Sequence, residues 1–419
     1  MFGFSGWWLT GLVCLVEVLS MLGFSSYAVL LAPLRDAWGL TNTEAGWIGG
    51  SFFAGYTIAV PVLVTLTDRM DPRRIWIAGA LLTVAGNAGF ATFADGFWPA
   101  LLFHAIAGTG LAGTYMPGLR LLADRLSGSA QSRAVGFYTA SFGIGTASSY
   151  LLADGMASAF SWQLAFAVPA ATSAVAILMV LLFVGPSAPP PKPTTRLLDL
   201  RPVLRNRDSV AYSIAYFAHS FELYTIRAWI ISFLAFSGGS VFAGGAFAPA
   251  KVAFAMAVLG IFSILLGAES SIRFGRKRTV AVLMSLSSAT GILLGLSYQI
   301  YEVAVVAALI YGMVLTSESA SVTAGALGNA DPKLRGATIA VHSMIGFAGG
   351  IFGPAVFGAV LDLAGGTDTA TAWIIAYAVL GTVTLIGPLS MLLLRPADLQ
   401  GDGAFRQARA ARSASSRAR

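Results

Sequence analysis

The sequence is poor in charged residues. Asp, Glu, Lys and Arg make up 11% of the 419 residues, whereas hydrophobic residues make up 56%. A soluble globular chain carries roughly 25% charged residues. So few charges cannot cover a soluble surface of this size, which excludes a soluble enzyme, a nucleic-acid-binding protein and a disordered interaction protein. The solvent that remains is a lipid bilayer.

Cysteine and histidine are scarce as well. The single cysteine, Cys14, lies in the first apolar run, and only three histidines occur in the chain. One thiol excludes a disulfide framework and a cysteine-based metal site. No Gly-x-x-x-x-Gly-Lys-Ser/Thr run is present, so a nucleotide is not expected to supply the energy. The sequence therefore predicts no catalytic residue, no metal and no cofactor.

Apolar runs long enough to cross a bilayer recur along the chain. The first run is longer than a signal peptide and has no Lys or Arg before it, so we expect an uncleaved span. The chain is predicted to be an all-α polytopic membrane protein with twelve transmembrane helices in two six-helix bundles. The predicted spans are 7–31, 44–66, 75–94, 98–122, 133–154, 162–184, 209–236, 248–270, 278–298, 302–328, 335–362 and 371–394.

The basic residues set the orientation of these spans. Of the 26 Lys and Arg residues, all but four fall in segments on one side of the predicted membrane. The four exceptions are Arg35, Arg120, Arg227 and Lys251. An asymmetry of this size predicts that both termini are cytoplasmic.

The longest linker divides the spans into two equal sets. Residues 185–207 are rich in proline and then basic, which keeps such a segment extended and in water. We expect a six-helix bundle on each side, over 1–184 and 208–395. The basic tail, 396–419, is expected to be disordered and to lie near anionic headgroups.

The two halves also repeat one another at a nearly constant offset. Charged residues recur about one half-chain apart, in the pairs Glu17 and Glu222, Arg69 and Arg273, and Arg133 and Arg335. A parallel internal repeat is typical of transporters that alternate access to a central site.

These features resemble the major facilitator superfamily. Its loop signature, Gly-x-x-x-Asp-Arg-x-Gly-Arg-Arg, is similar to Asp68-Arg69-Met70-Asp71-Pro72-Arg73-Arg74 after the second span. A second copy, Arg273-Phe274-Gly275-Arg276-Lys277, has Ile272 in place of the Asp. The fourth span carries His104 where the family often has Arg, followed by Gly108 and Gly110. The run Gly349-Gly350-Ile351-Phe352-Gly353-Pro354 is interpreted as a close helix contact.

The resemblance implies that the first, fourth, seventh and tenth spans line a central cavity. A charged side chain at mid-bilayer costs roughly 2.5–3.5 kcal/mol, so each one there needs a reason. We expect the ionisable residues within these spans to share an aqueous cavity as substrate- and proton-binding groups. The alternative for each is an interhelical contact that only holds the bundle together. The candidates are Glu17, His104, His219, Glu222, Arg227 and Glu318.

A second set of residues is expected to form gates on the cytoplasmic side. The resemblance implies this role for Asp68, Arg69 and Arg73, and by repetition for Arg273. Arg120 and Asp124 are four apart and are expected to pair, and Glu269 is expected to pair with Arg273. The alternative for Asp68, Arg69 and Arg73 is that these charges only set the topology, and the alternative for Arg120 and Asp124 is a snorkelled contact at the membrane interface.

The sequence thus predicts a monomeric secondary transporter of the cell inner membrane that binds a small-molecule solute and a coupling ion, which we expect to be H⁺. Arg227 favours an organic anion or zwitterion as the solute. Proton-antiport efflux of a metabolite or amphiphilic drug, coupling to sodium, and a non-transporting sensor or assembly factor on the same fold remain open. A membrane enzyme is disfavoured because no catalytic constellation is visible.

Overall fold

The computed structural model describes residues 6–67, 69–187, 201–238, 245–331 and 334–403. Within these ranges every regular element is a helix. The elements are α1 (Gly6–Met21), α2 (Ser26–Trp38), α3 (Asn42–Leu66), α4 (Pro72–Phe93), α5 (Phe97–Ala123), α6 (Gly128–Ala159), α7 (Leu164–Phe183), α8 (Arg201–Leu204), α9 (Arg207–Phe236), α10 (Pro249–Phe274), α11 (Arg276–Leu296), α12 (Tyr301–Ser317), α13 (Ser319–Gly328), α14 (Arg335–Leu363), α15 (Ala370–Thr384) and α16 (Ile386–Leu394).

The twelve predicted spans all correspond to long helices or helix pairs in the described ranges. Nine of these units are apolar enough to cross a membrane by composition alone. The other three are α5, α6 and α9, with 27, 32 and 30 residues, and they are long enough to cross as well. Of the three, α9 has no exposed large hydrophobic side chain, which fits a helix that faces other protein rather than lipid, whereas α5 and α6 do have such side chains.

The predicted first span was wrong in extent and in continuity. It runs to Trp38 as two helices, α1 and α2, instead of ending at residue 31. The interruption coincides with two hydrogen bonds to other helices. The Ser25 amide donates to the hydroxyl of Ser149 at 3.0 Å, and the Ser26 hydroxyl donates to the Ala165 carbonyl at 2.7 Å. These serines bond to neighbouring helices at the point where the helix breaks.

The tenth and twelfth spans are also interrupted. Glu318 separates α12 from α13, and Leu385 separates α15 from α16. Before the first break, the hydroxyls of Thr316 and Ser317 donate to carbonyls of their own helix turn, at 2.9 and 2.6 Å. Side-chain bonds of this kind compete with helix continuation.

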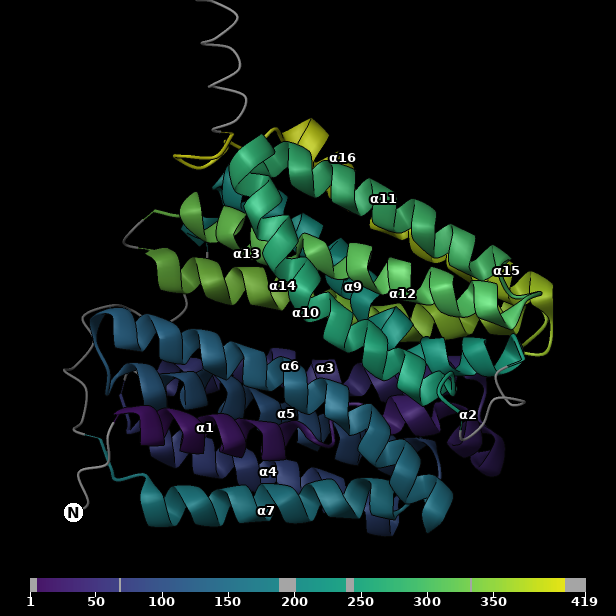
Figure 1. The fold of residues 1–419 in the computed structure, drawn as a ribbon, viewed down its shortest axis with the longest axis horizontal. Helices are drawn as coiled ribbons and strands as arrows, with labels where there is room; N and C mark the ends of the chain where they lie inside the picture. The colour runs from purple at the N-terminus through teal and green to yellow at the C-terminus, as the bar shows by residue number, and fades with distance from the viewer. Residues whose placement is uncertain (1–5, 68, 188–200, 239–244, 332–333, 404–419) are drawn as a thin grey trace, which may run out of the picture.

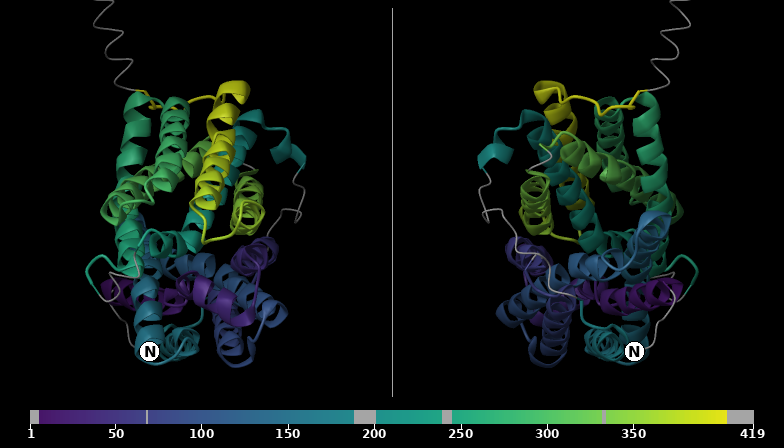
Figure 2. Two further views of the ribbon diagram at one scale, coloured as in Figure 1. Left: turned by 90° about the vertical axis from the view of Figure 1, so that its right-hand side faces the viewer. Right: turned by 90° about the vertical axis from the view of Figure 1, so that its left-hand side faces the viewer.

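The helices are arranged as two bodies. Figure 1 shows α1 to α7 together in its lower part and α9 to α16 above them, and Figure 2 shows the same separation from both sides. The ends of the sequence-predicted bundles, 184, 208 and 395, remain predictions. In the predicted linker, 185–187 and 201–207 are described, with α8 within the latter, and 188–200 lies outside the described residues.

The two bodies meet closely along α3 and α14, over the half of each helix that lies away from the basic loops. Glycine permits this approach: a Cβ on Gly46 would overlap the Pro354 carbonyl, and one on Gly50 would overlap that of Ile351. Within the second body, Gly349 and Gly353 lie against the backbone of α9. The close helix contact predicted for this glycine run is therefore confirmed.

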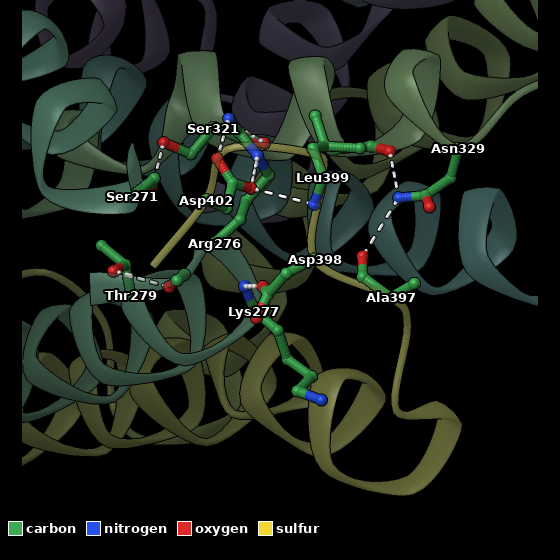
Figure 3. A network of polar contacts seen from close by, with 12 residues as sticks. Ser271, Arg276, Lys277, Thr279, Ser321, Asn329, Ala397, Asp398, Leu399 and Asp402 are labelled. Atoms are coloured by element: carbon green, nitrogen blue, oxygen red, sulfur yellow. Dashed lines mark hydrogen bonds and ion pairs between the residues drawn. The ribbon is translucent and has the colours of Figure 1, made fainter. Parts of the chain in front are cut away.

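The segment after α16 is held against the second body. Figure 3 shows Asp402 in a buried ion pair with Arg276, with contacts of 2.9 and 3.1 Å. The Lys277 amide donates to Asp398 at 2.9 Å, and the Gly403 amide donates to the Ile272 carbonyl at 2.8 Å. The prediction that the whole tail from 396 onward is disordered was therefore wrong for 396–403, and 404–419 lies outside the described residues.

Candidate functional site

A cavity of about 270 Å³ lies between the two bodies. Its walls come from both of them, and most of the lining side chains are aromatic or aliphatic. The residues that line it are Phe24, Tyr56, Leu111, Tyr115, Phe142, Tyr216, His219, Ser220, Leu223, Tyr224, Arg227, Ile264, Thr316, Ser319 and Phe347. Smaller cavities adjoin it, and Arg227 lines two of them as well. This is a concave, mostly apolar site with a few polar groups, as small-molecule sites are.

Arg227 is the full positive charge in this lining. It lies on α9 and its guanidinium lies over the rings of Phe24 and Tyr224, at 5.7 and 5.8 Å from their centroids. Among the described residues it has no ion pair and no hydrogen bond, and the cavity lining contains no carboxylate. The contacts that hold this cation are therefore cation–π contacts, which leave the N–H groups of the guanidinium for a ligand.

His219 connects the cavity to a buried carboxyl group. Its ring lines the cavity, and its Nδ1 lies 3.0 Å from Oε1 of Glu318. Both side chains are almost fully buried. Glu318 occupies the break between α12 and α13, and its other carboxyl oxygen has no partner in the described part of the chain. Among the described residues, the His219 imidazole is the group that both bonds the Glu318 carboxyl group and lines the cavity.

Glu222 is turned away from the cavity, into the second body. Its Oε1 accepts hydrogen bonds from the hydroxyls of Ser287 and Tyr311, both at 2.8 Å, and its Oε2 has no partner among the described residues. Glu222 and Glu318 are thus two buried carboxyl groups of the second body, each held by its own partners.

Glu17, at the matching position of the first half, is likewise buried within its own body. Its Oε2 lies 2.7 Å from the hydroxyl of Tyr138, which also lies 2.9 Å from the Tyr115 carbonyl. The Tyr138 hydroxyl thus joins the Glu17 carboxyl group to the backbone of α5.

His104 lies in one of the smaller cavities next to Arg227, and its ring is packed among aromatic side chains. Its Nδ1 lies 2.7 Å from the Ile48 carbonyl, so this nitrogen carries a hydrogen. The bond ties α5 to α3.

The expectation that all six candidates share one aqueous cavity was therefore wrong. His219 and Arg227 line the central cavity, and His104 lines a neighbouring one. Glu17, Glu222 and Glu318 are outside these linings, because hydroxyl and imidazole partners inside each body hold their carboxyl groups. The binding roles of all six remain predictions.

The predicted gate residues on the basic face form contacts within each body. Arg120 pairs with Asp124 at 3.3 Å, and Arg273 pairs with Glu269 at 2.6 Å, so both predicted pairings are confirmed. Arg73 donates to the Leu181 carbonyl at 2.9 Å, near the end of α7. Arg69 is exposed, and Asp68 lies outside the described residues. Their roles as gates remain predictions.

A contact between the bodies on the opposite face was not predicted. Asp362, at the end of α14, accepts four hydrogen bonds at the start of α3: from the amide and side-chain nitrogens of Asn42, at 3.0 and 2.8 Å, and from the amide and hydroxyl of Thr43, at 2.8 and 2.6 Å. Arg35 adds bonds to Asn42 and Thr367 at 2.7 and 2.9 Å. We call Asp362, Asn42, Thr43, Arg35 and Thr367 the outer latch. Only the polar residues at the two span ends could have indicated it.

The aromatic lining was also missed, since rings spread over five helices and the 22–25 break have no common spacing in the sequence. Together, the helical fold of the described residues, the two bodies and the cavity between them define a polytopic membrane protein with a cavity between its halves.

The chain belongs to the Major Facilitator Superfamily, whose family model matches residues 13–271 and 252–418. The human protein spinster homolog 1 is 24% identical over 239 residues, which is 54% of this chain and 45% of that protein. The Arabidopsis thaliana protein named "Probable anion transporter 6, chloroplastic" is 25% identical over 159 residues, 38% of this chain and 31% of that protein. The chain thus matches less than half the length of these curated relatives.

Among solved structures, a bacterial homologue of the human lysosomal transporter Spinster, in an inward-facing and unoccupied conformation, has a similar fold. The TM-score is 0.71 at 15% identity, over 93% of this chain and 95% of that one. At this identity the likeness establishes the fold, which is the one expected from the sequence.

Proposed function

We propose that the protein is a secondary transporter that moves a small organic anion across a cytoplasmic membrane by alternating access, coupled to protons. It acts as a monomer with its basic loops on the cytoplasmic side. The unpaired guanidinium of Arg227 in a cavity without carboxylates is the observation that carries this proposal. A cation that is removed from water in an apolar site is destabilised, and an anionic ligand would stabilise it.

The anion is favoured over a cation for the same reason. A cationic solute in this cavity would meet Arg227 and no compensating negative charge in the lining. An arginine fork suits a carboxylate because two N–H groups can bond both oxygens. The likeness to a probable anion transporter supports the same class of solute.

Proton coupling is supported by the contact between His219 and Glu318 at the cavity wall. His219 can accept a proton from the cavity side and pass it to Glu318, since its Nδ1 already bonds that carboxyl group. An anion at Arg227 and a proton on the His219–Glu318 pair would then cross together.

Alternating access is supported by how the bodies meet. In this structure the outer latch and the glycine contacts of α3 and α14 join them on the face opposite the basic loops. To bring the cavity to that face, the latch must break while the contacts inside each body stay intact. Rigid rotation of one bundle against the other satisfies both conditions.

The test is transport in proteoliposomes with a pH gradient imposed and organic anions as solutes. We expect uptake to follow the proton gradient and Glu318→Gln to abolish accumulation while leaving solute exchange. Glu302→Gln is the matched control, because Glu302 lies in the first turn of α12 and is exposed. Uptake that ignores the pH gradient would refute the coupling, and transport of cations alone would refute the solute class.

A further inference from the structure

We propose that the solute is an aromatic anion, a flat ring that carries one carboxylate-type group. This inference rests on the proposed anion site and names the part of the solute that the charge does not specify. It depends on what surrounds the guanidinium rather than on the guanidinium itself.

Aromatic rings enclose the cavity from both bodies. Seven of the lining side chains are aromatic: Phe24, Tyr56, Tyr115, Phe142, Tyr216, Tyr224 and Phe347. They come from α3, α5 and α6 and the 22–25 break on one side, and from α9 and α14 on the other. A flat solute between the bodies would therefore meet ring faces or edges in most directions.

The rings are already packed in pairs around the site. The ring centroids of Tyr56 and Phe347, which belong to different bodies, are 4.5 Å apart, and those of Tyr115 and Phe142 are 4.8 Å apart. Ring pairs at these separations are stabilised by offset or edge contacts beyond their buried area. A further flat ring can join such an array, whereas a puckered aliphatic ring of the same volume cannot make the same contacts.

Arg227 and the rings form one composite site. Phe24 and Tyr224 cover the guanidinium at 5.7 and 5.8 Å, so the cation and the aromatic surfaces lie side by side. A carboxylate on an aromatic ring lies in the ring plane, so it reaches the edge of the guanidinium while the ring rests among the aromatic side chains. The cavity of about 270 Å³ has room for such a solute.

The test is ligand binding to the purified full-length protein with a matched set of probes: benzoate, cyclohexanecarboxylate, benzamide and benzylamine. The second keeps the charge and loses the aromatic ring, the third keeps the ring and loses the charge, and the fourth reverses the charge. Binding is measured by thermal shift and by isothermal titration calorimetry. We expect benzoate to bind about 10-fold more tightly than cyclohexanecarboxylate, and benzamide and benzylamine not to bind.

Variants separate the two parts of the site. We expect Arg227→Gln to abolish benzoate binding, and Tyr224→Leu to bring the affinities of the two acids together. Lys251→Gln is the matched control for loss of a cation, since Lys251 lies outside the lining of this cavity. It is expected to leave both affinities unchanged.

The outcomes distinguish this inference from the proposed function. Equal affinities for the two acids, both lost in Arg227→Gln, would overturn the aromatic inference and leave the anion transporter standing. If neither acid binds, or if Arg227→Gln still binds them, both the aromatic inference and the proposed anion site are overturned.

Discussion

Breaking the outer latch should open the molecule on the face opposite the basic loops, and Asp362→Asn is the sharpest way to do so. Each carboxylate oxygen of Asp362 accepts two hydrogen bonds, one set from Asn42 and the other from Thr43. An asparagine amide has one oxygen and one NH₂ group. In either orientation the NH₂ group faces a backbone N–H donor of Asn42 or Thr43, so at least one of the four bonds is lost together with the charge at the start of α3.

The expected size follows from the capping role of this carboxylate. Removing a side-chain cap at a helix N-terminus costs about 0.5–2 kcal/mol, and a charge at that end adds about 0.3–1 kcal/mol where it is exposed. Asp362 is exposed to solvent, so we take a combined loss of about 1–2 kcal/mol. That loss applies only to the state in which the bodies touch here. The population ratio of outer-open to outer-closed molecules should therefore rise about 5- to 30-fold.

The assay is a distance measurement across the outer face by double electron–electron resonance. Spin labels are attached at Ala37→Cys and Asp368→Cys, two exposed positions on opposite bodies, in a Cys14→Ser background. We expect a longer distance to gain population in Asp362→Asn. Glu44→Gln is the control: Glu44 makes a similar pair of bonds on the same face, but to Thr41 of its own body. Unchanged distances in Asp362→Asn, or an equal shift in Glu44→Gln, would refute the reasoning.

Three further predictions concern packing and buried charge. Gly46→Ala should shift the same distance distribution toward the open state, because its Cβ would meet the Pro354 carbonyl, whereas Gly11→Ala, with open space around it, should not. Arg276→Ala should destabilise the protein by about 3–5 kcal/mol, because it leaves Asp402 buried and unpaired. The loss is measured as a lower melting temperature in detergent. A loss as small as that expected for an exposed pair, about 0–1 kcal/mol, would contradict this prediction. Tyr138→Phe should lower the free energy of unfolding by about 1–3 kcal/mol, because Glu17 loses its hydroxyl partner. In a Glu17→Leu background most of that loss should vanish. Equal losses in both backgrounds would show that the two side chains are not coupled.

The fold could be predicted from sequence because its determinants are local. Span length, the basic loops and the repeat of Glu17 in Glu222 each depend on a short stretch of chain or a fixed offset. The pairings of Arg120 with Asp124 and of Arg273 with Glu269 were predictable for the same reason, since residues four apart share a helix face. The interruption at 22–25 was not, because it depends on partners in other helices, Ser149 and Ala165.

The site was predictable only in part. An ionisable residue in a span is evidently functional or paired, but its sequence position does not say which way it points. Glu222 and Arg227 are five apart on α9, and one faces Tyr311 inside the second body while the other faces the cavity. The aromatic walls and the outer latch join elements from the two halves of the chain, and no spacing within either half encodes those contacts.

The two halves repeat in sequence but have diverged in charge, and this bears on how transport could be coupled. In the first body Glu17 has a tyrosine partner, whereas in the second body Glu222 is held by Ser287 and Tyr311, and Glu318 is bonded to His219 at the cavity wall. Arg227 lies on the same helix as His219. A single helix, α9, therefore carries both the proposed anion-binding group and, within the described residues, the observed link from the cavity to the Glu318 carboxyl group. A solute that moves α9 against the first body would act on both at once. Coupling in this protein is then expected to reside in the second half, with the first half supplying rings and the surface against which α9 moves.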